Sequence, residues 1–363
     1  MKILFFINSL VGGGAERVLV NLSDEFIKHG HDVTVAIKDN VIAYQLNTDV
    51  DIVCFDRIEK GWPKMLLPIV NNLHRIKETK KIIRTTAPDV IIASWGSDLF
   101  HILLGHKGIP VIASEHNTFD REHGIIEYVN RYWLNRYVNK VVVLTKYDKA
   151  FMARKLKNTI VIPNPLSFKP ISIQEYDTTF ANRKSILACG RLNAYQVKGF
   201  DTLLKSFGLI ANKYTEWNID IAGSGGENDF SRLKNIAREC GVEDRLHLLG
   251  FHSDIAQVMQ QHSIFALTSR SEGFGMVITE AMAMGCACVS FDLTGPSEII
   301  LDGIDGVLVD NQNVDAFASA LSDLIENKEK RYEIGRRAID DVRRFDSKMI
   351  AERWESIFYT VKA

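Results

Sequence analysis

Two glutamates eight positions apart, Glu272 and Glu280, enclose a segment that can bind a ligand through its backbone. The intervening Gly273-Phe274-Gly275-Met276 places a glycine on each side of an aromatic residue, which lets a backbone approach a ligand closely. The run MVITEAMAMG that follows is typical of a helix. We therefore expect Glu272 just before the helix start and Glu280 about one turn inside the helix.

The N–H groups at such a helix start have no partners within the helix and attract an anion. The carboxylates on either side of the helix start can accept hydrogen bonds from hydroxyl groups. A ligand that offers hydroxyls on both sides of a phosphate, as a nucleotide sugar does, would fit this arrangement. An exposed, solvated acidic loop is the alternative that the segment alone leaves open.

Two cations follow a predicted strand, SILACG. Arg191 comes directly after this strand, and Lys198 precedes the next predicted helix. Ligands of open α/β sheets bind beyond the carboxyl ends of the strands, so we expect both side chains on the ligand side. Together they can neutralise a diphosphate leaving group without a metal ion, Arg191 as a fork and Lys198 as a point charge. Either cation alone would more simply be a surface residue.

Two further segments lie at predicted strand ends in the N-terminal half. Gly12-Gly13-Gly14 follows the first strand and opens a helix, where free N–H groups can hold a phosphate. The dinucleotide pattern G-x-G-x-x-G fails here, because the chain has Arg17 where the last glycine is required. His116, within Ser114-Glu115-His116-Asn117-Thr118, can donate a hydrogen bond to a substrate hydroxyl, although a lone histidine is more often structural.

Length and composition limit the possible functions. The chain has 363 residues, enough for about two domains. It is 46% hydrophobic and 25% charged with a formal net charge of -1, which argues against nucleic-acid binding through a uniformly basic face. The five cysteines lack C-x-x-C spacing, which favours a cytoplasmic protein and no metal. No apolar run reaches the roughly 20 residues of a membrane span.

Short apolar runs alternate with helical patterns along the chain, which predicts parallel strands joined by crossover helices. The expected strands are ILFFIN, VTVAI, IVCF, VIIAS, PVIAS, KVVVL, TIVIP, SILACG, WNIDIAG, RLHLLGF, SIFALTS, CACVSF and GVLVD. The alternation stops at Ile162-Pro163-Asn164-Pro165 and the polar stretch that follows it. We therefore predict an α/β fold of two Rossmann-like doubly wound domains facing across a cleft, over residues 1–165 and 185–345, with a linker at 166–184.

The sequence also contains amphipathic and basic segments outside these strands. Met349, Ile350, Trp354, Ile357, Phe358 and Val361 have helical spacing and predict one apolar face on a C-terminal helix over 346–363. Residues 57–84 contain eight Lys or Arg and two Glu, interleaved with apolar residues. Such a segment can lie on an anionic membrane, although a solvated helix face is the alternative. A second run, Arg131-Tyr132-Trp133 to Arg136-Tyr137, could contact lipid diphosphate or headgroups.

Taken in order, the segments GGGAER, SEHNT, GRL with KGF, EGFGMVITE and GPSEI resemble those of the retaining family 4 glycosyltransferases of the GT-B fold. The resemblance covers essentially the whole chain, and its most specific element is the E-x7-E motif at Glu272 and Glu280. It implies transfer of a hexose or N-acetylhexosamine from a nucleotide sugar, with UDP the expected nucleotide. It also implies retention at the anomeric carbon with no metal or covalent nucleophile.

The resemblance further implies roles for the residues above. Glu280 would hold the ribose hydroxyls, and Glu272 with the backbone of Gly273, Phe274, Gly275 and Met276 would contact the donor sugar. The residues expected to bind the diphosphate are Arg191 and Lys198, with Gly13 and Gly14 from the other lobe. His116 would stand beside the donor sugar near the reacting carbon, so the expected catalytic residues are His116, Glu272, Arg191 and Lys198.

The same resemblance implies that the C-terminal helix packs back on the N-terminal domain, which would bind the acceptor. The spacing from Arg191 to Lys198 is longer than is usual in the family, so we expect a bulged loop between them. The expected acceptor is a surface glycan or a polyprenyl-diphosphate-linked saccharide, and the expected location is the cytoplasm, with peripheral contact at the inner face of the plasma membrane.

Other functions remain open at this point. A GT-B sugar-nucleotide epimerase or a non-catalytic nucleotide-sugar-binding protein would need much the same donor site. A glycosidase fits badly, because its two carboxylates must face one bond from opposite sides at about 5–10 Å. Here one of the two carboxylates is assigned to ribose.

Overall fold

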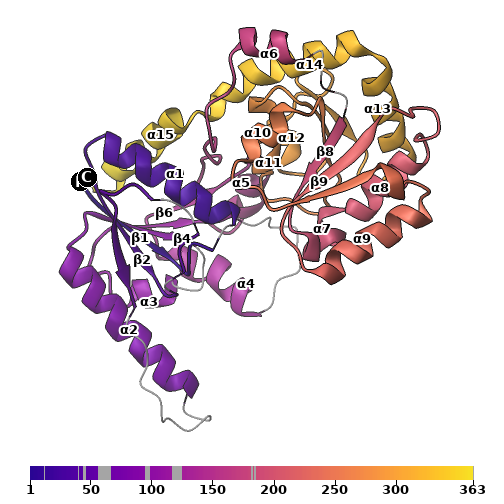
Figure 1. Ribbon diagram of the computed structural model, residues 1–363. Coiled ribbons are helices and arrows are strands. Elements are labelled where there is room, and N and C mark those ends of the chain that lie inside the picture. The colour runs from indigo at the N-terminus through magenta and orange to yellow at the C-terminus, as the bar shows by residue number, and fades with distance from the viewer. Residues whose placement is uncertain are drawn as a thin grey trace. The chain divides into compact units, whose positions relative to one another are not determined.

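The computed structural model describes residues 1–11, 13–39, 41–43, 46–55, 67–94, 99–116, 125–180, 183 and 185–362. The chain forms two compact units (Figure 1). The first unit comprises Met1–Ser167 and Ser347–Ala363, and the second comprises Phe168–Asp346. Each unit has its own parallel sheet, so the predicted two-domain α/β class is confirmed.

The sheet of the first unit is entirely parallel, with strand order β3-β2-β1-β4-β5-β6-β7. Its strands are β1 (Lys2–Ile7), β2 (Asp32–Ile37), β3 (Asp51–Cys54), β4 (Val90–Ser94), β5 (Val111–Ser114), β6 (Lys140–Val143) and β7 (Thr159–Val161). Central strands such as β4 are buried along their whole length. This burial is why they consist of nearly continuous β-branched and apolar residues and do not alternate with polar ones.

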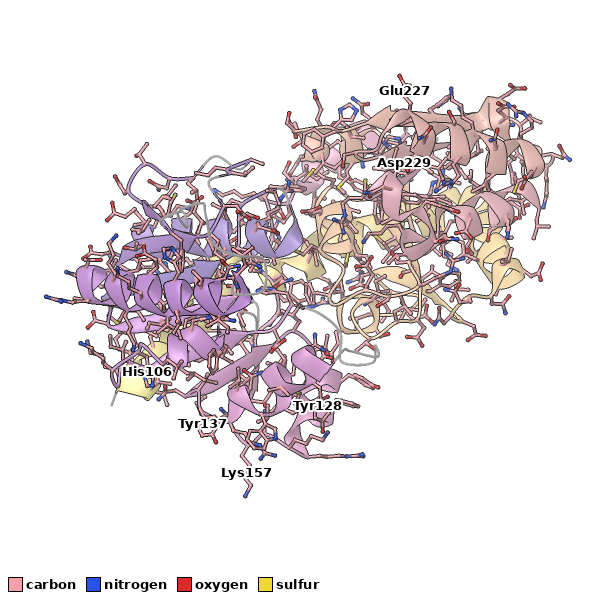
Figure 2. All side chains as sticks on the ribbon, turned by 90° about the horizontal axis from the view of Figure 1, so that it is seen from below. His106, Tyr128, Tyr137, Lys157, Glu227 and Asp229 are labelled. Carbon is pink, nitrogen blue, oxygen red and sulfur yellow. The ribbon has the colours of Figure 1, made fainter. Side chains whose placement is uncertain are left out.

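Helices connect these strands and cover the sheet. They are α1 (Gly14–Lys28), α2 (Leu67–Thr86), α3 (Leu99–Leu103), α4 (Ile125–Tyr132), the 3-10 turn η1 (Leu134–Arg136) and α5 (Lys146–Ala153). Tyr128 on α4 and Tyr137, directly after η1, are exposed (Figure 2). Within the described ranges, no helix has both the length and the apolar character needed to cross a bilayer.

The last helix, α15 (Ser347–Lys362), belongs to the first unit and packs beside α1. The ring of Phe358 meets that of Phe26 edge to face, with the ring centroids 5.3 Å apart. Glu355 accepts hydrogen bonds from His29 Nδ1 at 2.7 Å and His31 Nε2 at 3.0 Å. Of the apolar face predicted for this helix, Met349 does not take part, because it is 52% exposed.

The second unit repeats the design with strand order β10-β9-β8-β11-β12-β13, again all parallel. Its strands are β8 (Ser185–Cys189), β9 (Asn218–Ala222), β10 (Leu246–Gly250), β11 (Ile264–Leu267), β12 (Ala287–Phe291) and β13 (Gly306–Val309). Every strand expected from the sequence is therefore found in one of the two sheets.

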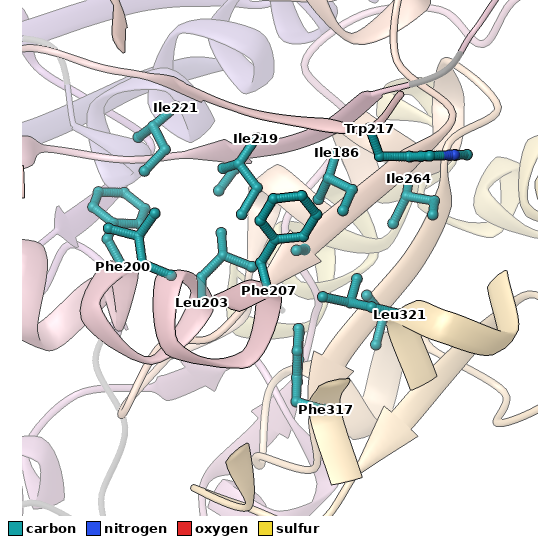
Figure 3. Packing of buried hydrophobic residues seen from close by; sticks show 14 of the residues in the cluster. Ile186, Phe200, Leu203, Phe207, Trp217, Ile219, Ile221, Ile264, Phe317 and Leu321 are labelled. Atoms are coloured by element: carbon teal, nitrogen blue, oxygen red, sulfur yellow. The ribbon is translucent and has the colours of Figure 1, made fainter. Parts of the chain in front are cut away.

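The helices of the second unit cover its sheet. They are α6 (Ile173–Thr179), η3 (Leu192–Ala194), α7 (Tyr195–Lys198), α8 (Phe200–Gly208), α9 (Glu227–Glu239), η4 (Glu243–Arg245), α10 (Ile255–Gln260), α11 (Met276–Ala283), α12 (Pro296–Ile299), α13 (Val314–Glu326), α14 (Lys328–Asp341) and η5 (Val342–Phe345). Figure 3 shows Phe200, Leu203 and Phe207 of α8 facing Ile219 and Ile221 of β9. The core of this unit therefore includes the space between α8 and the sheet, and Phe317 and Leu321 of α13 belong to the same cluster.

Two segments differ from the sequence-based predictions. Residues 166–184 were expected to be an irregular linker, but they contain helix α6, whose N-cap is Ser172. Tyr176 of this helix is fully buried and stacks on Tyr332, so the segment is part of the second unit. The expected bulged loop between Arg191 and Lys198 is instead helical, because η3 and α7 take up the additional residues.

The strand order fixes where a ligand can bind in each unit. In the second unit the order reverses between β8 and β11, and in the first unit it reverses between β1 and β4. Ligands of doubly wound sheets bind beyond the carboxyl ends of the strands at this reversal. The segments after β8 and β11 carry Arg191 and Glu272, and the segment after β1 carries Gly13 and Gly14.

The packing of α15 yields a stability prediction. Phe358→Ala should lower the free energy of unfolding of the first unit by about 3–5 kcal/mol, because it leaves a cavity beside Phe26. Hydrogen exchange of the α1 amides measures this change. Tyr359→Ala removes a neighbouring ring that is 61% exposed and should change the same quantity by less than about 0.5 kcal/mol. Equal effects of the two substitutions would contradict the packing described here.

Candidate functional site

Glu272 lies in the loop that joins β11 to α11 and is held by two donors. Its Oε1 accepts a hydrogen bond from Lys198 Nζ at 2.7 Å and another from Ser269 Oγ at 2.6 Å. The side chains of Lys198 and Glu272 are 23% and 12% exposed, so the ion pair is largely shielded but still reachable from solvent. The structure thus brings together two residues 74 positions apart that were predicted separately.

Glycine backbones determine where Lys198 can lie. Gly199, which ends α7, has a φ of +67°, and a Cβ there would stand 1.7 Å from the carbonyl oxygen of Thr268. Thr268 Oγ1 also donates to the Gly199 carbonyl at 2.7 Å. On the other side, a Cβ at Gly190 would meet the alkyl stem of Lys198 at 3.0 Å. Only glycine at 199 therefore allows α7 to pack this closely against the end of β11.

An ion pair that the sequence reasoning missed ties the same elements together. Arg270 donates to both carboxylate oxygens of Asp201, at 2.9 and 2.7 Å. Burial alone would raise the pKa of Asp201, but the hydrogen bonds from Arg270 lower it overall. The Arg270 backbone N–H also donates to the carbonyl of Val197 at 2.8 Å. The β11–α11 loop and the start of α8 are thereby fixed to each other, which holds Glu272 opposite Lys198.

The segment between the two glutamates presents its backbone at the start of α11. Gly275 is the N-cap and has a φ of +97°, a conformation that favours glycine. The Phe274 ring points into the core, where it meets Phe345 edge to face at 5.5 Å. A Cβ at Gly295 would lie 2.5 Å from the Phe274 carbonyl oxygen, so the turn before α12 packs directly on this loop. What residues 273–276 offer a ligand is therefore main-chain N–H groups.

Glu280 lies on α11 and is nearly inaccessible, with 4% of its surface exposed. Burial is the main cause of the raised pKa of the Cys189 thiol at the end of β8, and the nearby Glu280 carboxylate adds to it. Glu280 therefore lies near the Cys189 side chain at the end of β8. The structure places Glu280 in the expected turn of α11. Its side chain is more buried than that of Glu272.

Arg191 follows β8 and is exposed, and its side chain has no hydrogen bond or ion pair among the described residues, while its carbonyl accepts a hydrogen bond from the Ala194 N–H at 3.1 Å. The backbone around it is tightly packed. A Cβ at Gly223 would lie 1.8 Å from the Gly190 carbonyl oxygen, and the Leu192 N–H donates to the Ser224 carbonyl at 2.8 Å. The ends of β8 and β9 thus form a closely packed, glycine-rich base from which the guanidinium of Arg191 extends.

In the first unit, Gly13 is the N-cap of α1 and Gly14 its first residue. The carboxylate of Glu16, in the first turn, lies over Gly13, because its Oε2 is 2.3 Å from where a Cβ would stand. A carboxylate is stabilised at a helix start for the same reason as a phosphate. A phosphate at α1 would therefore have to displace Glu16. Gly12 lies outside the described residues.

His116 follows β5 at the carboxyl edge of the first sheet. Its Nε2 lies 3.1 Å from Ser114 Oγ, and its Nδ1 is buried without a hydrogen-bond partner among the described residues. Burial lowers the pKa of His116 to about 4, so the ring is neutral at physiological pH. A neutral imidazole can exchange hydrogen bonds with a hydroxyl but supplies no positive charge. Asn117 and Thr118, in the same predicted segment, lie outside the described residues.

Glu115, beside His116, has a structural role that sequence reasoning did not identify. It is buried and accepts a hydrogen bond from Asn135 Nδ2 at 2.9 Å, and Arg131 Nε lies 3.5 Å from its other oxygen. The basic run at 131–137 is thus partly buried, since Arg131 pairs with Glu115. Among the described residues, no cluster of three His, Cys, Asp or Glu has the arrangement of a metal site.

Comparisons with known proteins show which families the chain matches. Residues 12–168 match the family described as Glycosyltransferase Family 4, and residues 174–341 match Glycosyl transferases group 1. The chain is 28% identical to the amylovoran biosynthesis glycosyltransferase AmsD of Erwinia amylovora, over 98% of this chain and 99% of that protein.

A second relative, from Campylobacter jejuni, is named GalNAc-alpha-(1->4)-GalNAc-alpha-(1->3)-diNAcBac-PP-undecaprenol alpha-1,4-N-acetyl-D-galactosaminyltransferase. It is 24% identical over 100% of this chain and 99% of its own length. Among solved structures, Anabaena HepE in complex with UDP and glucose superimposes with a TM-score of 0.75 at 19% identity, covering 99% of this chain and 100% of that one. This likeness confirms the GT-B fold.

The lowered pKa of His116 predicts how stability depends on pH. Its pKa is about 4 in the folded chain and 6.5 in an unfolded one. As the pH falls from 6.5 toward 4, the unfolded chain binds a proton that the folded chain excludes, so the unfolding free energy falls by up to about 1.4 kcal/mol per pH unit. Urea unfolding of the wild type and His116→Gln at pH 7, 6 and 5 should show a shallower decline for the variant. Above pH 7 the two slopes should agree, and equal slopes below pH 6.5 would refute the lowered pKa of His116.

Proposed function

We propose that this chain, which belongs to the GT-B glycosyltransferases, transfers a hexose or N-acetylhexosamine from a UDP-sugar with retention at the anomeric carbon. The observation that carries the proposal is the Lys198–Glu272 pair beside the start of α11, at the sheet reversal between β8 and β11. A cation, a carboxylate and free main-chain N–H groups there match the diphosphate and hydroxyl groups of a nucleotide sugar. The solved relative that holds UDP and glucose supports UDP as the nucleotide.

We assign the donor contacts as follows. The diphosphate accepts hydrogen bonds from the Lys198 ammonium, the exposed Arg191 guanidinium and the N–H groups at the start of α11. Glu272 then accepts hydrogen bonds from hydroxyls of the donor sugar, and Glu280 from those of the ribose. Because Glu280 is 4% exposed, its contact requires the ribose to enter deeply between the end of β8 and α11.

The reaction breaks the bond between the anomeric carbon and the diphosphate oxygen and forms one from the same carbon to an acceptor oxygen. The acceptor approaches from the side of the leaving group, and a phosphate oxygen takes its hydroxyl proton. Lys198 and Arg191 stabilise the negative charge that develops on the leaving diphosphate. Two cations and a helix start provide this stabilisation, so the proposed mechanism requires no metal ion and no cofactor besides the donor.

We assign acceptor binding to the first unit. Its His116, which is neutral, can exchange a hydrogen bond with a hydroxyl of the donor sugar, and its helix start at Gly13 and Gly14 can contact a donor phosphate that displaces Glu16. The acceptor class is a surface glycan or a polyprenyl-diphosphate-linked saccharide. The relatives support it, since the name of one refers to amylovoran biosynthesis and that of the other to a saccharide on PP-undecaprenol.

We further propose peripheral contact with an anionic membrane, where a polyprenyl-linked acceptor resides. Of the basic segment 57–84, residues 57–66 lie outside the described part of the chain. The remainder forms most of α2, whose exposed cations are Arg75, Lys77, Lys80, Lys81 and Arg84. The same helix exposes Ile69 and Leu73, at 60% and 63%.

Calorimetry with UDP-, GDP- and ADP-sugars, followed by transfer assays with the donor that binds, tests the function. We expect UDP-sugars to bind best, and Lys198→Met to weaken binding by about tenfold or more, since a charged hydrogen bond to phosphate is lost. Arg238→Met removes a cation that pairs with Glu243 on the surface of the same unit and should leave the affinity unchanged. Turnover of a UDP-sugar to an epimer without acceptor would contradict the transferase assignment, as would binding with no transfer to any saccharide acceptor.

A further inference from the structure

Ser114 places a buried hydroxyl at the end of an otherwise apolar strand. All four residues of β5 are buried, and Ser114 is 5% exposed. A buried hydroxyl is almost always hydrogen-bonded, and here the partner is Nε2 of His116, 3.1 Å from Ser114 Oγ. Among the described residues the hydroxyl has no second hydrogen bond. The serine is therefore explained by the imidazole two positions further along the chain.

The direction of this hydrogen bond determines which ring nitrogen of His116 carries the hydrogen. Burial lowers the pKa of His116 to about 4, so at physiological pH the neutral ring has a single N–H. If Nε2 held that hydrogen and donated to Ser114, the serine O–H and the ring's Nδ1 would both be left without a partner among the described residues. If Ser114 donates to Nε2 instead, only the Nδ1–H is left unpaired. Hydrogen-bond satisfaction therefore favours the tautomer with the hydrogen on Nδ1.

Glu115, the residue between the serine and the histidine, anchors the main chain at this point. Its N–H donates to the Val142 carbonyl of β6 at 2.9 Å. Its buried carboxylate accepts a hydrogen bond from Asn135 Nδ2 at 2.9 Å and lies 3.5 Å from Arg131 Nε. With the main chain held at Glu115, the hydroxyl and the imidazole keep their relative position before a ligand binds, as a preorganised site requires.

Nδ1 of His116 is buried and unpaired, and His116 stands at the carboxyl edge of the first sheet, where ligands of such sheets bind. An unpaired buried N–H is costly, and a ligand oxygen that moves aside the atoms covering Nδ1 removes this cost. We propose that Ser114 is a positioning residue, which by donating to Nε2 holds the hydrogen of His116 on Nδ1, from where the ring donates to a hydroxyl oxygen of the donor sugar. No proton is transferred in this contact, because the ring remains neutral throughout.

This inference deepens the proposed function and rests on it, because the ligand oxygen belongs to the nucleotide sugar. It adds a direction to the contact, with the protein as donor and the sugar oxygen as acceptor. Fluorine in place of the sugar hydroxyl can still accept a weak hydrogen bond, whereas hydrogen in its place can neither accept nor donate. A donating His116 therefore distinguishes a fluorinated sugar from a deoxygenated one, and an accepting His116 would reject both alike.

Nitrogen NMR of the full ligand-free chain with isotope-labelled histidine tests the tautomer, and His116→Gln identifies the signals of this ring. At neutral pH the hydrogen should be on Nδ1 in the wild type and in Ser114→Thr, which keeps the hydroxyl. Ser114→Ala removes the donor to Nε2, so the hydrogen should move at least partly to Nε2. Ser23→Ala deletes a fully buried hydroxyl of α1 that has no hydrogen bond among the described residues, and this matched control should leave the His116 signals unchanged.

Transfer assays test the consequence for the reaction. Ser114→Ala should lower kcat/KM for the UDP-sugar about tenfold, since one sugar contact is weakened, while Ser114→Thr and Ser23→Ala should stay within about twofold of the wild type. The affinity for UDP alone should not change in any of these variants. Among UDP-sugars altered at one hydroxyl at a time, one position should show the fluorinated sugar preferred to the deoxygenated one by at least about threefold, and Ser114→Ala should abolish that preference.

Three results would each overturn the proposal: a hydrogen on Nε2 in the wild type, equal kcat/KM in Ser114→Ala and Ser23→Ala, or no position at which fluorine is preferred to hydrogen. None of them contradicts the donor contacts of the second unit, which calorimetry with UDP tests separately. A chain that binds no UDP-sugar contradicts the proposed function instead, and the tautomer of the ligand-free chain still decides the role of Ser114. Thermal melting of Ser114→Ala, expected to match the wild type, separates a loss of transfer from a loss of folding, and recovery in Ser114→Thr does so independently.

Discussion

The ion pair between Lys198 and Glu272 is the interaction on which the site of the second unit depends. It joins the segment after β8 to the segment after β11, the two strands between which the sheet order reverses. The pair can form only because Gly199 lets α7 lie against the Thr268 carbonyl. The bidentate pair of Arg270 with Asp201 then fixes both segments from outside. The functional groups are thereby positioned by the scaffold before a ligand arrives, as precise recognition requires.

A shielded ion pair is a poor source of stability, because removing two charges from water offsets most of their attraction. Ligand binding explains the presence of the Lys198–Glu272 pair at this position better than stability does. Lys198 and Glu272 pair with each other, and in the proposed function a nucleotide sugar would offer each of them another hydrogen-bond partner. The Lys198 ammonium would donate to a phosphate, and sugar hydroxyls would donate to the Glu272 carboxylate. Ser269 would continue to donate to the same carboxylate and hold it in place. In either state each of the two charged groups would keep a hydrogen-bond partner.

The sequence was sufficient for both sheets, because strands buried on two faces consist of unbroken apolar runs. It also predicted Arg191, Lys198 and Glu272 at strand ends, since parallel topology brings those ends to one edge. It did not reveal Arg270 with Asp201 or Glu115 with Asn135, because such pairs depend on tertiary packing of distant segments. Helix α6 was missed although its Ser172 and Glu175 form a recognisable N-cap pattern, since the neighbouring prolines dominated the prediction. Glu280 was placed in the correct helix turn, but periodicity gives no measure of its depth.

The affinities of Glu272→Gln for UDP and for its UDP-sugar test the central claim most directly. Glutamine keeps the size of the side chain but releases Lys198 from its ion pair. We predict that UDP binds this variant as tightly as the wild type or more tightly, while the extra affinity contributed by the sugar ring is lost and transfer falls. If the affinity for UDP falls as far as that for the UDP-sugar, with thermal melting unchanged, Glu272 acts by holding Lys198 and its assignment to the donor sugar is wrong.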